Sequence, residues 1–179
     1  FTPILPVHKN AFAYIQGKSI KDNALVHSSN SYFLKMDFSN FFNSITPNIF
    51  WNFFEETNVK FSGLDRILLS HLLFWKPSKY QQNLVLSIGA PSSPLISNFC
   101  MYKFDVVISE FCKNNNINYS RYADDLTFST NTANYLSNLP LIVSKLLKEL
   151  YGNSMEINLL KTSFSSKKTN RHITGITIT

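Results

Sequence analysis

The sequence centres on Tyr122-Ala123-Asp124-Asp125, which lies between two short segments of roughly alternating character, 117–121 and 126–130. Both flanks are rich in aromatic, β-branched and apolar residues, so they predict two strands of a hairpin with the carboxylates at the bend. Adjacent carboxylates repel each other, and burying one without a partner is costly. A tip packed against other elements therefore implies a bound cation, whereas a tip in solvent is an ordinary Asp-Asp turn.

A third carboxylate, Asp37, follows a segment that is apolar or aromatic except at Lys35. This segment, 31–36, predicts a largely buried strand with Asp37 at its carboxyl end, where it can converge with the hairpin tip. Three aspartates from two neighbouring elements suit hard divalent cations, Mg²⁺ first and Mn²⁺ second. Two such ions about 4 Å apart stabilise both the attacking and the leaving oxygen in phosphoryl transfer.

Three segments, taken in order, resemble the successive palm motifs of reverse transcriptases: Phe33–Phe42, Gly89–Pro94 and Tyr122–Asp125. Each motif alone is weak to moderate, but the ordered set is specific. Two more segments are similar to the NAxxH and VTG motifs of the retron branch, Asn23–His27 and Ile173–Gly175. The resemblance spans residues 10–179. It departs from the common pattern at Ile88, where the family has Gln, and at Ile173, where it has Val.

The resemblance implies a role for each matching residue in metal-dependent transfer of deoxynucleotides onto a primer. The implied catalytic residues are Asp37, Asp124, Asp125 and Lys161. The aspartates and the backbone carbonyl of Phe38 would hold two Mg²⁺ ions, or Mn²⁺ in their place. Expected nucleotide contacts are Phe42, Gly89, Ala90, Pro91 and Lys161. Expected nucleic-acid contacts are Asn23, His27, Ser92, Tyr122, Arg171, Thr174 and Gly175.

Physical chemistry supports several of these roles but leaves an ordinary alternative for each. Phe42 lies five residues beyond Asp37, the place of the family's steric gate, and a bulky ring beneath the sugar leaves no room for a 2′-hydroxyl. It is otherwise a core residue. Lys161 is a compact proton donor suited to the leaving pyrophosphate, or else a surface lysine. An isolated histidine such as His27 is more often structural than a ligand.

The expected fold is an α+β reverse-transcriptase palm, a small antiparallel β-sheet backed by α-helices. Residues 1–30 are expected to join fingers and palm and residues 31–179 to form the palm catalytic domain, with the fingers and the thumb outside this chain. Thr46-Pro47 and Ser62 predict helix starts, and Pro94 to Cys112 predicts one long helix. Asp105 and Glu110 on that helix are expected to face solvent.

The 179 residues carry a net charge of +6 and are 44% hydrophobic, which suits one well-packed domain with a polyanionic partner. The resemblance implies an RNA template, a DNA or RNA primer and a dNTP, with a retron non-coding RNA and an effector protein as further partners. Two cysteines without metal-site spacing predict reduced thiols, and the absence of a long apolar run predicts a cytoplasmic protein without a membrane partner.

Two other interpretations remain open from the sequence. One is a group II intron-like or phage-defence reverse transcriptase without a retron RNA. The other is a nucleic-acid-binding palm module that no longer catalyses, for which a broken aspartate triad would be the signature; the triad here is complete.

Overall fold

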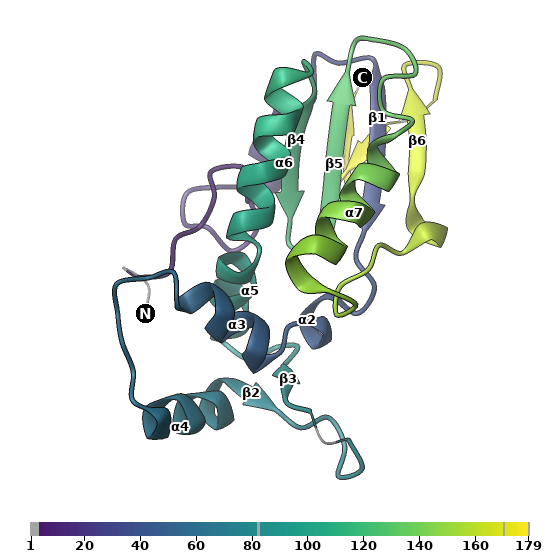
Figure 1. Ribbon diagram of the computed structural model, residues 1–179. Coiled ribbons are helices and arrows are strands. Elements are labelled where there is room, and N and C mark those ends of the chain that lie inside the picture. The colour runs from purple at the N-terminus through teal and green to yellow at the C-terminus, as the bar shows by residue number, and fades with distance from the viewer. Residues whose placement is uncertain (1–3, 82, 170, 179) are drawn as a thin grey trace. The chain divides into compact units, whose positions relative to one another are not determined.

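The computed structural model describes residues 4–81, 83–169 and 171–178, and it contains both helices and small antiparallel sheets (Figure 1). The expected α+β class is confirmed. The chain divides into two compact units, of which the first combines residues 1–7 with 40–102 and the second combines 8–39 with 103–179. The expected division at residues 30 and 31 concerned motif regions and stays a prediction.

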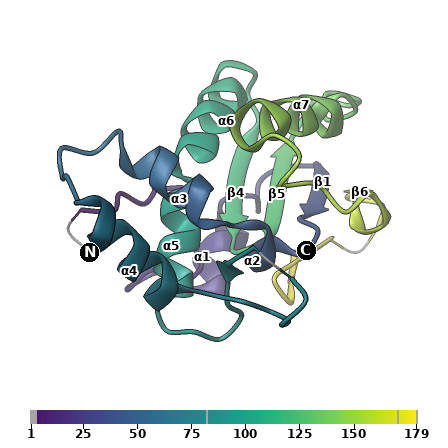
Figure 2. The ribbon, with the colours of Figure 1, turned by 60° about the horizontal axis from the view of Figure 1, so that its bottom comes forward.

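The second unit is built on a four-stranded antiparallel sheet with the strand order β4-β5-β1-β6. The strands are β1 (Tyr32–Asp37), β4 (Asn118–Tyr122), β5 (Asp125–Thr130) and β6 (Ser163–Ser166). Helices α6 (Tyr102–Asn114) and α7 (Leu139–Tyr151) cover one face of this sheet (Figure 2). The strands predicted at 31–36, 117–121 and 126–130 are therefore present, each within a residue or two of the expected bounds.

Alternation along the strands decides which side chains meet the helices. Leu34, Phe128 and Tyr119 are neighbours across three strands and are all buried. The hydroxyl of Tyr119 bonds Asp105 of α6, so this set faces the helices. Since successive residues point to opposite faces, Phe33, Asp37 and Asp125 lie on the other face.

That other face carries helix α1 (Ile20–Leu25) and a hairpin of β7 (Arg171–Ile173) and β8 (Ile176–Ile178). Ala24 of α1, Phe33 of β1 and two isoleucines of the hairpin, Ile173 and Ile178, form one buried apolar cluster. Helix α1 begins with a capping box, in which Ser19 accepts from the backbone of Asp22 while Asp22 accepts from the backbone of Ser19. The NAxxH and Ile-Thr-Gly segments therefore pack against the same side of the sheet.

His27, which follows α1, links the layer formed by α1 and the β7–β8 hairpin to the sheet through two short hydrogen bonds. Its Nδ1 lies 2.7 Å from Ser129 Oγ and its Nε2 lies 2.8 Å from Ser120 Oγ, and its side chain is fully buried. Asn30 donates to the same Ser129 at 2.8 Å, and Arg171 donates to the Asn30 carbonyl at 2.6 Å. Burial lowers the pKa of His27 to about 3, so the ring is neutral in the folded protein.

The first unit contains mainly short helices around an aromatic core. Its elements are α2 (Phe41–Ser44), α3 (Pro47–Phe54), α4 (Gly63–Leu73), β2 (Phe74–Trp75), β3 (Val85–Leu86) and α5 (Ser93–Cys100). Phe50 contacts Trp51, Phe54, Phe74 and Phe99 with ring centroids 4.9–6.0 Å apart. The predicted helix starts are confirmed, because Thr46 accepts from Ile49 N and Ser62 forms a capping box with Asp65.

One predicted element is wrong in form. The long helix expected from Pro94 to Cys112 is broken at Met101, where ψ is −5°, well away from the helical value of about −42°. Nothing in the residue type at this position predicts the break. Cys100 and Cys112 are both buried and neither forms a disulfide, in agreement with the expected reduced thiols. None of the helices described is both long enough and apolar enough to span a membrane.

We expect the His27 network to make stability depend on pH. The pKa of His27 is about 3 in the folded protein and about 6.5 in the unfolded chain, so below pH 6.5 the unfolded chain takes up a proton that the folded protein does not. The stability that this residue contributes above pH 6.5 is therefore lost as the pH falls. The loss from this group between pH 7.5 and pH 5 is about 2 kcal/mol. Urea unfolding of wild type and His27→Gln at both values measures it. The stability gap between the two proteins should narrow at pH 5, and an unchanged gap would show that His27 is not held neutral.

Candidate active site

The hairpin tip is a two-residue loop. Tyr122 and Asp125 are partners in the β4–β5 ladder, which leaves Ala123 and Asp124 to make the bend. Ala123 has a φ of 55°, in the left-handed region that costs a non-glycine residue roughly 1–2 kcal/mol. Strain of this kind persists only where surrounding contacts fix the backbone, and it concentrates at functional sites. The loop that carries Asp124 is therefore held in place and is not a loose solvated turn.

Asp37 lies directly across from Asp125 in the β1–β5 ladder. Directly opposite Cα atoms in antiparallel strands are about 4.5–5.5 Å apart. The backbone N–H of Phe38 donates to the carbonyl of Asp124 at 3.3 Å, and the N–H of Asn158 donates to the carbonyl of Asp37 at 2.7 Å. The end of β1 and the hairpin tip are thus tied together, with Asp37 and Asp125 on the face opposite α6 and α7.

The three carboxylates interact electrostatically. Burial raises the pKa of Asp124, and the charge on Asp37 raises it further. Burial also raises the pKa of Asp125, with added contributions from Asp124 and Asp37. Both carboxyl groups are therefore harder to ionise than a free aspartate, chiefly because they are partly buried and also because negative charges lie next to them. A cation among them would relieve that repulsion.

Lys161 supplies positive charge to this cluster from the 3₁₀ turn η1 (Leu159–Lys161). Its Nζ donates to Asp37 Oδ2 at 2.8 Å, and this bond raises the pKa of the lysine. The lysine side chain is 61% exposed, whereas that of Asp37 is 14% exposed. The amine is therefore also accessible to solvent or to a ligand.

The donor set suits a hard cation. Asp37 Oδ1 is buried without a hydrogen-bond partner, which is the state of an oxygen free to coordinate a metal. In the part of the chain that the structure describes, no three His, Cys, Asp or Glu side chains surround a common point as placed. At this site the ammonium of Lys161 is bonded to Asp37 Oδ2 in the place of a cation.

The expected nucleotide-pocket residues belong to the other unit, and their contact with a nucleotide stays a prediction. The Phe42 ring is partly buried and packs edge-to-face on Phe41 with centroids 5.2 Å apart. Gly89 has a φ of 87° and is exposed together with Pro91, while Ala90 and Ser92 are partly buried. Ser92 is the N-cap residue of α5 but makes no side-chain cap hydrogen bond.

Three expected nucleic-acid contacts need correction, because the structure buries them. Asn23, His27 and Arg171 are 1%, 0% and 4% exposed. Both ring nitrogens of His27 and one guanidinium nitrogen of Arg171 form hydrogen bonds in the network behind the sheet. The Arg171 guanidinium also lies 5.2 Å from the Phe33 ring centroid. These three side chains are part of the packed interior and are not accessible to a strand of nucleic acid. Tyr122 and Thr174 are partly exposed and Gly175 is exposed, so their contacts remain predictions.

Sequence reasoning missed a buried ion pair beneath the hairpin tip. Asp105, expected in solvent, is fully buried and pairs with Arg121 at 2.7 Å, and a second guanidinium nitrogen donates to the same carboxylate at 2.9 Å. Tyr119 donates its hydroxyl to Asp105 at 2.6 Å. The remaining arm of Arg121 donates to the carbonyl of Ala123 at 3.0 Å. Arg121 was the one sequence signal that could have predicted this pair. Strand alternation places Arg121 on the helix-covered face, and a buried guanidinium requires an acidic partner.

Comparison with known proteins agrees with this geometry. The family model described as reverse transcriptase (RNA-dependent DNA polymerase) matches residues 2–178. The chain belongs to the reverse transcriptase family. It is 48% identical to the Retron Ec83 reverse transcriptase of Escherichia coli over 97% of this chain and 56% of that protein. It is 32% identical to the Retron Ec73 reverse transcriptase of the same organism, over 90% of this chain and 52% of the relative.

The chain is thus of the retron type, and it spans about half the length of the curated relatives it matches. The group II intron-like alternative is not favoured by these relatives. Among solved structures, telomerase from Candida albicans in complex with a fragment of telomeric RNA superposes with a TM-score of 0.60 at 13% identity, over 88% of this chain and 32% of that one. Apo telomerase from Candida tropicalis gives 0.58 at 16% identity, over 88% and 35%. At such identities the likeness concerns the fold alone.

We expect Asp105→Ala to be strongly destabilising, because it leaves the buried guanidinium of Arg121 without its carboxylate. The expected loss is about 3–5 kcal/mol in urea unfolding. The double variant Asp105→Leu/Arg121→Met removes both charges and should recover much of that loss. The matched control is Glu55→Ala, which breaks an exposed pair with Arg66 at 2.8 Å and should change stability little. Equal effects of the two single alanine variants would contradict the buried pair's role.

Proposed function

We propose that this chain carries the catalytic site of an RNA-directed DNA polymerase of the retron type. A primer 3′-hydroxyl attacks the α-phosphate of a dNTP, a phosphodiester bond forms, and pyrophosphate leaves. The observation that carries the proposal is the pairing of Asp37 with Asp125 across two strands, with Asp124 beside them at a fixed tip. No single segment contains this arrangement, and its carboxylates are the groups that phosphoryl transfer requires.

Asp37, Asp124 and Asp125 would hold two divalent cations, Mg²⁺ or Mn²⁺, and the backbone carbonyl of Phe38 would be a further ligand. When bound, these ions lower the pKa of the attacking hydroxyl and screen the charge of the triphosphate. The buried free oxygen of Asp37 and the raised pKa values of Asp124 and Asp125 support this assignment. The residues contribute fixed positions, since catalysis of this kind is mostly alignment and electrostatics.

Lys161 would act on the leaving group. In the structure its ammonium is bonded to Asp37, which keeps it protonated beside the carboxylates. With Asp37 engaged in the proposed metal site, the exposed lysine would be free to reach the triphosphate. It can there neutralise charge and deliver a proton to the pyrophosphate oxygen.

The remaining contacts follow the motifs of the family. Phe42 would exclude ribonucleotides, and Gly89, Ala90 and Pro91 would shape the pocket around the nucleotide. Tyr122, Ser92, Thr174 and Gly175 would contact the RNA template and the primer. A retron non-coding RNA as template belongs to the same proposal and is supported by the retron relatives. An effector protein as partner and a cytoplasmic location complete the proposal.

Replacing one catalytic carboxylate should abolish synthesis while preserving the fold. In the full-length protein we expect Asp124→Asn to incorporate no measurable dNTP on a primed RNA template, with an unchanged circular dichroism spectrum. The matched control is Glu110→Gln, an exposed acid on α6, which should extend the primer at the wild-type rate. Wild-type extension by Asp124→Asn would refute the assignment.

Metal binding can be followed without activity. Mg²⁺ at several times its Kd should raise the melting temperature of the wild-type protein, because it binds only the folded state. Asp125→Asn should lose most of this rise. Without metal, Asp125→Asn should be as stable as wild type or more stable, because the raised pKa of Asp125 marks a charge held at a cost. A full Mg²⁺ response in the variant would contradict the proposed ligand set.

A further inference from the structure

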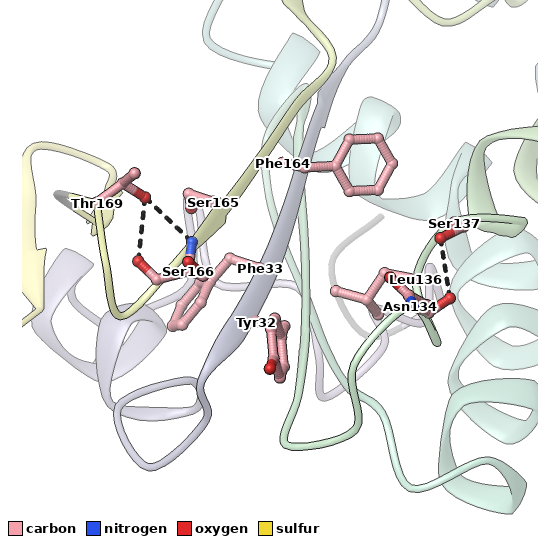
Figure 3. Close-up of a pocket in the computed structure, with 9 residues that line it drawn as sticks. All are labelled: Tyr32, Phe33, Asn134, Leu136, Ser137, Phe164, Ser165, Ser166 and Thr169. Atoms are coloured by element: carbon pink, nitrogen blue, oxygen red, sulfur yellow. Dashed lines mark hydrogen bonds between the residues drawn. The ribbon is translucent and has the colours of Figure 1, made fainter.

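A pocket of about 490 Å³ lies in the second unit on the edge of the four-stranded sheet. Strands β1 and β6 form one side of it and the loop that precedes α7 forms the other (Figure 3). The rings of Tyr32 and Phe164 extend from the strands, while Asn134, Leu136 and Ser137 come from the loop. Nothing in the catalytic proposal uses this pocket.

Tyr32 and Phe164 present two aromatic rings from the same face of the sheet edge (Figure 3). Tyr32 pairs with Ser166 and Leu34 pairs with Phe164, so Tyr32 and Phe164 are diagonal neighbours on the same face of the sheet. Diagonal positions are about 7–8 Å apart. If the two rings turn parallel while their backbone positions keep that separation, one base fits between them with a van der Waals contact of about 3.5 Å to each ring. Phe164 is 57% exposed, although burial of its ring would be favourable.

The polar groups around the rings suit a nucleobase and its backbone. The three segments that build the pocket, 28–34, 131–140 and 162–169, contain no Asp or Glu, and their only charged residues are Lys167 and Lys168. Both lysines are exposed in the turn after β6. Asn134 offers an amide donor and acceptor at the rim, and the Ser137 hydroxyl donates to the Asn134 carbonyl at 2.9 Å, which fixes the loop. Aromatic rings, amides and lysines without carboxylates form the usual surface for unpaired nucleotides.

The pocket is separate from the aspartate site. Tyr32 opens β1 and Asp37 closes it, a run of five steps and so roughly 16 Å along the strand. Tyr32 and Leu34 are two residues apart in β1, so both side chains point toward the helix-covered face, whereas Asp37 lies on the opposite face. A nucleotide held here would not occupy the position of the incoming dNTP or of the primer end.

We propose that this pocket is an accessory site for single-stranded nucleic acid, in which one unpaired base stacks between Tyr32 and Phe164. Lys167 and Lys168 bind the adjoining phosphates, and Asn134 contacts the edge of the base. RNA and DNA share this chemistry, so either strand type satisfies the site. The proposal concerns binding alone and does not depend on catalysis by the aspartates.

Photochemical cross-linking locates the base directly. Full-length protein is irradiated with an eight-nucleotide oligouridylate that carries one 5-iodouridine, and in a parallel sample with the corresponding DNA that carries 5-iododeoxyuridine. We expect a cross-link in the tryptic peptide Thr162–Lys167, at Phe164, with RNA, DNA or both. Cross-links confined to other peptides in both samples would overturn the proposal. So would a failure of both oligonucleotides to bind, which would favour a protein ligand for the pocket.

Affinity measurements test the stacking step. By fluorescence anisotropy with the same oligonucleotides, Phe164→Ala should weaken binding about tenfold, the effect of losing one base–aromatic stack. Phe164→Tyr keeps a ring and should bind as wild type does. The control Leu160→Ala removes a side chain that is 98% exposed and lies outside the pocket, and it should have no effect. Equal affinity of Phe164→Ala and wild type would overturn the proposal, even if the protein remains an active polymerase.

The proposed contacts of Lys167 and Lys168 with phosphates predict how the binding affinity depends on salt concentration. Lys167→Ala/Lys168→Ala should lower the slope of log Kd against log salt by about 1.4, as expected for two phosphates of a single strand. The double variant Lys145→Ala/Lys148→Ala, with both changes on exposed α7 positions, is the control and should keep the slope. An unchanged slope in the Lys167/Lys168 variant would contradict the phosphate contacts.

Discussion

The register between β1 and β5 is the constraint on which the candidate site depends. It places Asp37 opposite Asp125 and, through the two-residue bend, next to Asp124. A slip of one residue would turn Asp37 toward the helices and Leu34 away from them. Met36 and Leu126, which occupy the helix-covered face beside this site, are both buried, so such a slip would bury the charge of Asp37 among apolar side chains. Core packing thus sets the position of Asp37, the carboxylate that we propose to be catalytic.

Buried polar networks fix the strand pair β4–β5 from both sides. On the helix-covered face, Arg121 joins Asp105 and reaches the carbonyl of Ala123. On the opposite face, His27 bridges Ser120 and Ser129. Such networks add little net stability relative to an apolar core, but leaving any member unpaired is costly, so they define one arrangement of the strands. A site that depends on carboxylate positions benefits from that uniqueness more than from stability itself.

Much of this fold and site could be predicted from the sequence, because local signals carried it. Alternation predicted the strands, the caps at Thr46 and Ser62 predicted helix starts, and the ordered motifs predicted that Asp37 would meet the hairpin. The misses involve contacts between distant residues. Asp105 has an ordinary helical context, and only its ion pair with Arg121 shows that it is buried. His27 carries a motif that suggests a ligand contact, yet both its nitrogens are used within the fold.

Anomalous diffraction from crystals of the full-length protein with Mn²⁺ and a non-hydrolysable dNTP tests the central claim most directly. The strand register predicts anomalous peaks within coordination distance, about 2.0–2.6 Å, of oxygens from Asp37 and from the hairpin aspartates together. It also predicts that Lys161 no longer bonds Asp37 in that state. Peaks ligated by Asp124 or Asp125 without Asp37, or metal bound elsewhere on the chain, would contradict the account.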